Sequence, residues 1–147
     1  MEAVLRSGHL AQGKRTEEFE QKFAAYCGAR YAAAFSNGTT ALHSALYAVG
    51  VGPGDEVIVP TFSFISSSNS VLMQNAKPVF ADIDEATFNL DPASLEAKIT
   101  KKTKSVMPVH LFGQVADMDA ILSAAEGIPV VEDACQAHGA EFNGKKA

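Results

Sequence analysis

The sequence lacks a long apolar run, a surplus of basic residues and clustered cysteines, and each absence argues against a class of protein. A membrane-spanning helix needs about 20 consecutive apolar residues, and no segment provides them. The first residues show no basic stretch followed by an apolar one, so no signal peptide is indicated. The net charge is −5 and the basic residues are scattered, which argues against binding of nucleic acid.

The spacing of the cysteines and histidines argues against a metal site. The two cysteines, Cys27 and Cys135, lie far apart and match no metal-ligand spacing. The histidines are dispersed and form no pair at helical i, i+4 spacing, so we predict no metal site. Two isolated cysteines without a signal peptide favour a reducing compartment, and we expect a cytoplasmic protein.

What the sequence does contain is an alternation of strand-like and helix-like segments. Its 147 residues are 47% hydrophobic and 20% charged, which is typical of a folded globular domain. Each of the first four strand candidates is followed by a helical stretch, at intervals of roughly 25 residues that suit crossover helices. This pattern predicts an α/β fold with a mainly parallel sheet and helices on both faces. The strand candidates are residues 31–35, 56–60, 78–83, 105–111 and 128–132.

Local signals predict several helix boundaries. Thr16 and Asp117 are residues of the type that begins helices. Asp91 is expected to begin another helix, because Pro92 then occupies the first helical position. Gly28 is expected to end the first long helix in a left-handed conformation.

The first candidate site is the segment of residues 36–42, which lies between a strand candidate and a helix. Gly38 allows close approach of a ligand, and the free N–H groups of a helix start suit an anion such as phosphate. Ser36, Thr39 and Thr40 add hydroxyl groups. The alternative is an ordinary turn in which the serine or the asparagine of this segment only caps the helix.

The second candidate site is the segment of residues 130–139. Glu132 and Asp133 end an apolar strand, at the edge where open α/β sheets bind ligands. A carboxylate there could pair with the protonated ring nitrogen of pyridoxal phosphate (PLP), and Gln136 and His138 could reach the same ligand. The alternative is that Asp133 caps a helix and His138 is structural.

The third candidate site follows the strand candidate that ends at Pro60. An aromatic ring of Phe62 or Phe64 could stack on a flat cofactor, although phenylalanines at such junctions more often pack into the core. Because all three segments follow strand candidates, we expect them to meet at one edge of the sheet.

Taken in order, the segments resemble the DegT/DnrJ/EryC1/StrS family of PLP-dependent nucleotide-sugar aminotransferases. The resemblance covers nearly the whole chain, and the joint pattern is far more specific than any single motif. It rests on GKRTEEFE (residues 13–20), SNGTTALH (36–43), GPGDEVIVPTF (52–62), PVFADID (78–84), PVHLFGQ (108–114) and EDACQAHG (132–139).

The resemblance implies a fold-type-I aminotransferase that works as a homodimer, with its sites at the subunit boundary. Residues 38–40 would then hold the cofactor phosphate, and Phe64 would stack on the pyridine ring. Asp133 would bind the ring nitrogen, and Gln136 would lie near the ring oxygen. The implied cofactor-binding residues are therefore Gly38, Thr39, Thr40, Phe64, Asp133 and Gln136.

The implied reaction moves an amino group, commonly from glutamate, to a keto-sugar carried on a nucleotide, for amino-sugar or surface-polysaccharide biosynthesis. Two alternatives remain open. One is a sugar dehydratase of the same family, in which histidine replaces the Schiff-base lysine. The other is a non-catalytic protein that keeps only a ligand-binding or dimerisation surface.

We expect residues 1–147 to be the N-terminal part of the PLP-binding large domain, without the small C-terminal domain. The resemblance places the Schiff-base lysine beyond the segment that follows Asp133, so we expect it to be absent and the chain alone to be inactive. The sequence around Asn143 and Gly144 predicts a hairpin turn without a returning strand. Lys145 and Lys146 are interpreted as solvated turn residues that do not replace that lysine.

Overall fold

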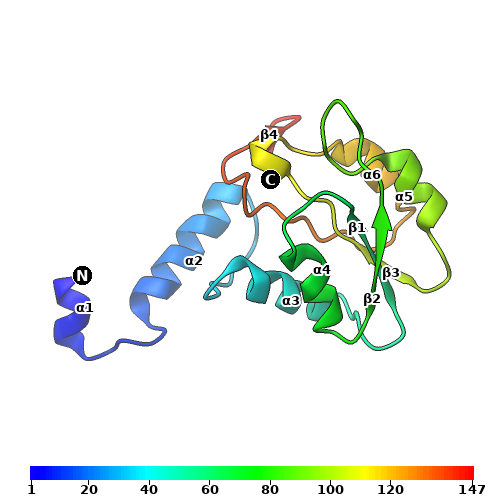
Figure 1. Cartoon of the computed structure of the whole chain (residues 1–147). Coiled ribbons are helices and arrows are strands. Elements are labelled where there is room, and N and C mark those ends of the chain that lie inside the picture. Colours follow the sequence, from blue (N-terminus) through cyan, green and yellow to red (C-terminus); the bar gives the residue numbers. More distant parts are fainter. The chain divides into compact units, whose positions relative to one another are not determined.

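Three parallel strands form the central sheet, in the order β2-β1-β3 (Figure 1). The computed structural model describes residues 1–147 and divides them into two units, Met1–Phe35 and Ser36–Ala147, of which the second contains the sheet. The strands are β1 (Glu56–Pro60), β2 (Lys77–Ala81) and β3 (Thr103–Val106). In the register, Ile58 of β1 lies opposite Val79 of β2 and Val106 of β3.

Helices cover both faces of this sheet, as the sequence predicts. The crossover from β1 to β2 contains α4 (Ser66–Leu72), and the crossover from β2 to β3 contains α5 (Pro92–Lys98). Figure 1 shows α4 with α3 (Gly38–Ala48) on one side of the sheet, and α5 with α6 (Met118–Ala124) on the other.

The side chains of β1 alternate between these two helical layers, so both faces of the strand are buried. Val57 and Val59 belong to one hydrophobic cluster, and Ile58 belongs to the other. The first cluster is Leu42, Leu46, Val51, Val57, Val59, Val71, Ala76, Met107 and Val131. The second is Ile58, Ala81, Leu90, Leu95, Val106, Ala116, Met118, Ile121 and Ala125.

Three of the five strand predictions need correction. The strand predicted at residues 105–111 is β3, which starts at Thr103 and already ends at Val106. Residues 31–35 form no strand, and the Ala34 N–H donates to the Glu20 carboxylate at 2.8 Å. Residues 128–132 run parallel to the continuation of β3 but pair only through the isolated bridge between Val106 and Val130. The physical reason is Pro108, which has no N–H to donate and so interrupts the ladder.

The cap predictions succeed where one side chain decides the helix start. The Asp91 carboxylate accepts from the N–H groups of Ala93 and Ser94, and Asp117 caps α6 by accepting from Ala120. Gly28 ends its helix with a φ of 68°. These contacts are local, so sequence alone can predict them.

The prediction for Thr16 is wrong. The helix α2 (Lys14–Cys27) starts three residues earlier than a cap at Thr16 predicts, with Gly13 in an extended conformation as its N-cap. Gly13 supplies its carbonyl oxygen to Thr16 N at 2.8 Å, so Thr16 lies inside the first turn. The same unit also contains α1 (Glu2–Ser7).

The end of the chain forms a short hairpin of β4 (Glu141–Phe142) and β5 (Lys145–Lys146). The expectation that no strand returns is therefore wrong. Lys145 is exposed, whereas the Lys146 ammonium pairs with the Glu141 carboxylate at 2.7 Å. None of the helices in the chain has the length and apolar character that crossing a bilayer requires.

Candidate functional site

The three candidate segments meet in the unit Ser36–Ala147, as the sequence predicts. The Thr39 hydroxyl group at the start of α3 lies 2.7 Å from the Ser66 hydroxyl group of α4. The next residue of α4, Ser67, donates its hydroxyl hydrogen to the Asp133 carboxylate at 3.1 Å. The helix that follows β1 therefore connects the start of α3 to Asp133.

The start of α3 offers free backbone donors. Asn37 is the N-cap, and its side-chain oxygen accepts from Thr40 N at 3.0 Å. The alternative that the asparagine of this segment caps the helix is therefore correct. The N–H groups of Gly38 and Thr39 find no acceptor within the chain. Two unpaired N–H groups at the positive end of a helix form a favourable position for an anion such as phosphate. The cap and the anion site are therefore compatible.

Gly38 also has a packing role that sequence reasoning missed. A Cβ atom added to this residue would lie 2.5 Å from the sulfur of Cys135, which is closer than two such atoms can approach. With the Cys135 side chain in this position, only glycine lets α3 start this close to the segment that carries Asp133.

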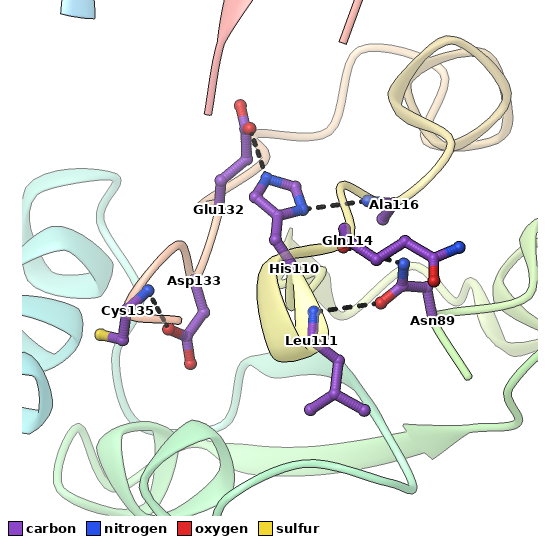
Figure 2. Close-up of polar contacts among 8 residues, drawn as sticks. All are labelled: Asn89, His110, Leu111, Gln114, Ala116, Glu132, Asp133 and Cys135. Atoms are coloured by element: carbon purple, nitrogen blue, oxygen red, sulfur yellow. Dashed lines mark hydrogen bonds and ion pairs between the residues drawn. The ribbon is translucent and has the colours of Figure 1, made fainter. Parts of the chain in front are cut away.

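Asp133 supplies a buried carboxylate, with 7% of the residue exposed. One carboxylate oxygen accepts from Cys135 N at 3.2 Å (Figure 2). The other accepts from the Ser67 hydroxyl group. No helix begins at Asp133, because the chain continues in turns, so the helix-cap alternative is wrong. A carboxylate has about four lone-pair sites, so Asp133 keeps the capacity to bind a cationic N–H group beside these donors.

The carboxylate also affects its neighbour Cys135. Burial of the sulfur, together with the hydrogen bond and the negative charge of Asp133, raises the pKa of the Cys135 thiol to about 11. The thiol is therefore protonated at neutral pH, and we assign no nucleophilic role to it.

The serines of α4 were not predicted to take part. Ser68 and Ser70 donate to carbonyl groups of their own chain segment, which is usual for serines in helices. Ser66 and Ser67 instead reach residues that are distant in the sequence. The available signal was a run of serines directly after the carboxyl end of a strand, but it does not show which serine reaches which partner.

Phe64 lies at the rim of this region, with 67% of the residue exposed. The core-packing alternative is therefore wrong for Phe64. It is also wrong for Phe62, which is 47% exposed, although its ring lies 6.1 Å from the ring of Phe88. An exposed aromatic face at the carboxyl end of β1 is available for stacking on a flat ligand.

Gln136 is oriented by the loop that follows the continuation of β3. Its side-chain oxygen accepts from Phe112 N at 2.9 Å, so the amide NH₂ group is left to donate. Phe112 has a φ of 53° and is 79% exposed. His138, which was predicted beside the same ligand, is an exposed residue of the same segment.

A second polar network, shown in Figure 2, supports this loop and was also missed. The buried ring of His110 accepts from Ala116 N at its Nδ1 atom, so its proton is on Nε2, which contacts the Glu132 carboxylate at 2.9 Å. Asn89 accepts from Leu111 N and donates to the carbonyl oxygen of the nearby Gln114. Of the two adjacent acids, Glu132 thus binds His110, and Asp133 remains the candidate for ligand binding.

Comparison with known proteins agrees with this geometry. The sequence profile of the DegT/DnrJ/EryC1/StrS aminotransferase family matches residues 1–147. GDP-perosamine synthase of Caulobacter vibrioides is 56% identical over 137 residues, which cover 92% of this chain and 37% of that protein.

Solved structures show the same likeness. The structure of S. venezuelae DesV matches with a TM-score of 0.96 and 44% identity, over 99% of this chain and 40% of that one. GDP-4-keto-6-deoxy-D-mannose-3-dehydratase from E. coli, with bound hydrated PLP, matches with a TM-score of 0.92 and 32% identity, again over 99% and 40%. The chain thus spans well under half the length of these relatives and has the fold of PLP fold-type-I aminotransferases.

Proposed function

Because the chain belongs to the DegT/DnrJ/EryC1/StrS aminotransferase family, we propose that it forms part of the cofactor site of an enzyme that transfers an amino group to a nucleotide-linked keto-sugar. The observation that carries the proposal is the buried Asp133 carboxylate, held by α4 next to the free N–H groups that start α3. Residues 1–147 then belong to the N-terminal part of the large domain.

The donors and acceptors of the site fit PLP at both of its ends. The N–H groups of Gly38 and Thr39 would bind the phosphate. The Thr40 hydroxyl group donates to the Asn37 carbonyl oxygen in this structure and would add a third donor on turning toward the phosphate. At the other end, the Asp133 carboxylate would bind the protonated ring nitrogen. Between them, Phe64 offers an aromatic face, and the Gln136 NH₂ group can donate to the ring oxygen.

When bound, PLP acts as an electron sink that supports transfer of the amino group. The residues of this chain bind it and orient it. A carboxylate at Asp133 stabilises positive charge on the ring nitrogen, and its burial strengthens that attraction because little water competes. The start of α3 holds the phosphate in place, so the ring is fixed relative to Asp133.

The proposal extends to the substrates and the assembly of the whole protein. The name of GDP-perosamine synthase supports a sugar carried on a nucleotide as the amino acceptor. The family resemblance supports glutamate as the amino donor, a homodimer with sites at the subunit boundary, and a cytoplasmic location.

A dehydratase of the same family is the second candidate, and the match to the E. coli enzyme favours it. That match has 32% identity, against 56% for the perosamine synthase, so amino transfer is the better supported activity. A purely binding protein is the third possibility and is an outcome of the test below.

The test uses the full-length protein of which this chain is part. Purified protein is incubated with PLP, glutamate and a panel of GDP-, UDP- and dTDP-linked keto-sugars, and the products are identified by mass spectrometry. We expect an aminated sugar, whereas a deoxygenated sugar would indicate the dehydratase, and PLP binding without any product would indicate a binding protein. Protein that binds no PLP would refute the cofactor assignment.

A matched pair of variants tests the role of Asp133. Asp133→Ala should lower turnover about 10²–10³-fold, by analogy with the loss of one charge-stabilising group at an active site. Glu85→Ala removes an exposed acid outside the site and should leave turnover unchanged. Full activity of Asp133→Ala would refute the assignment of this carboxylate.

A further inference from the structure

The hydroxyl group of Ser67 is a side-chain donor to the Asp133 carboxylate. Ser67 is 2% exposed, and its oxygen lies 3.1 Å from Oδ2 of Asp133. A second serine follows in the same chain of contacts, because the Ser63 hydroxyl oxygen lies 2.7 Å from that of Ser67. Three side chains from two distant segments thus form a line that ends at the carboxylate.

The direction of these hydrogen bonds follows from the chemistry of the groups. An ionised carboxylate can only accept, so the Ser67 O–H donates to Asp133. A hydroxyl group has one hydrogen to donate, so Ser67 must accept from Ser63. The hydrogen bond from Ser63 thereby polarises the O–H group of Ser67, and hydrogen bonds in such chains strengthen one another.

The position of Ser67 within α4 also links the two ends of the site. The preceding residue, Ser66, contacts the Thr39 hydroxyl group beside the free N–H groups of α3. Two consecutive residues of one short helix therefore contact the start of α3 and the carboxylate. Ser68 follows directly, but its hydroxyl group donates to the carbonyl oxygen of Ile65 and reaches neither end.

We propose that Ser67, polarised by Ser63, is a positioning residue that aims the Asp133 carboxylate at the ring nitrogen of the cofactor and stabilises its negative charge. The inference rests on the proposed PLP site. A buried hydroxyl group that donates to an ionised carboxylate stabilises its negative charge, because little water competes for it. Its loss should weaken the interaction with the ring nitrogen and leave the phosphate end of the site unchanged.

The test isolates that interaction by comparing two ligands on the full-length protein. The dissociation constants of PLP and of its 1-deaza analogue, in which a C–H group replaces the ring nitrogen, are measured by absorbance titration. Both ligands carry the same phosphate and aldehyde groups, so the ratio of the two constants reports on the ring nitrogen alone. We expect the wild type to prefer PLP, and Ser67→Ala to reduce that preference about tenfold.

Two further variants complete the design. Ser68→Ala removes a buried hydroxyl group from the same helix and should leave the preference for PLP as in the wild type. Ser63→Ala should reduce the preference in the same direction as Ser67→Ala but less, because only the polarising donor is lost. If Ser67→Ala fails to melt cooperatively, Ser63→Ala decides the question.

The outcomes separate this inference from the proposed function. An unchanged preference in Ser67→Ala, or in Ser63→Ala where that variant decides, overturns the role of Ser67 while the PLP site stands. A wild type that binds both ligands equally refutes the ring-nitrogen role of Asp133, and the role of Ser67 with it. A wild type that binds neither ligand refutes the proposed function itself.

Discussion

At the scale of single residues, the contact between Gly38 and Cys135 determines how closely α3 approaches the Asp133 segment. Gly38→Ala would place a methyl group 2.5 Å from the Cys135 sulfur, so the Cys135 side chain or one of the two segments must shift. We expect this variant to destabilise the protein by about 1–3 kcal/mol, the usual range for overpacking, and to weaken PLP binding. Thermal melting and PLP titration of the full-length protein measure the two effects.

The double variant Gly38→Ala with Cys135→Ala is the control. Without the sulfur, the nearest atom is the Cys135 Cβ at 3.8 Å, which is an ordinary contact. The double variant should therefore recover most of the lost stability, as a non-additive pair. If the two losses simply add, the contact does not determine the approach.

The site residues divide into those that local sequence can reveal and those that it cannot. Asn37 and Asp133 follow from residue type and from their place after a strand candidate. The partners of Ser67 and His110 lie 66 and 22 residues away, so no local pattern reports them. Such contacts follow only from how the strands are ordered in the sheet.

At the scale of elements, the amino end of the sheet is held by Glu56 of β1. Its carboxylate accepts from the Thr100 hydroxyl group at 2.7 Å and pairs with the Lys77 ammonium of β2 at 3.1 Å. These two hydrogen bonds, with Thr100 the larger cause, lower the pKa of Glu56 below its usual value. Glu56 thus connects β1, β2 and the loop before β3.

The lowered pKa predicts how stability depends on pH. A carboxylate with a depressed folded-state pKa stabilises the protein above its unfolded-state pKa and loses this effect as pH falls through the folded-state pKa. Glu56→Gln should therefore lower the melting temperature at pH 7 and flatten its decline below about pH 4.5. Melting curves from pH 7 down to pH 3 measure both effects.

The matched control for this prediction is Glu96→Gln, which removes an exposed carboxylate from α5. Its melting temperature should follow that of the wild type at every pH. Equal curves for Glu56→Gln and the wild type would contradict a role for Glu56 in the acid response.

The elements also show why the fold class was predictable and some boundaries were not. The apolar run of β1 predicts a buried central strand, and the structure confirms it because both helical layers contact it. The strand predicted at residues 128–132 depends on whether its neighbour can donate hydrogen bonds, and Pro108 removes one donor. The hydrophobic pattern of a segment shows whether that segment suits a strand. Whether the strand forms its ladder also depends on the segment beside it.

At the scale of the whole molecule, the sheet has a partly open edge at β2. This strand pairs with β1 on one side only, and Phe80 is 50% exposed. Lys77 and Pro78 at the start of β2 are residue types that discourage further strand pairing, but Val79 and Phe80 offer no such protection. Exposed apolar residues on a strand edge favour association between copies of the chain.

We therefore predict that the 147-residue chain associates as its concentration rises, and that Phe80→Lys weakens this association. A lysine on an edge strand disfavours pairing because it brings a charge that must remain solvated. The control is Tyr47→Lys, which introduces the same charge at a 75% exposed aromatic residue of α3, away from the strand edge. Sedimentation velocity over a range of concentrations measures the association. If both variants reduce it equally, the added charge is the cause and the edge of β2 is not the contact; if the wild-type chain stays monomeric, the exposed edge does not drive association.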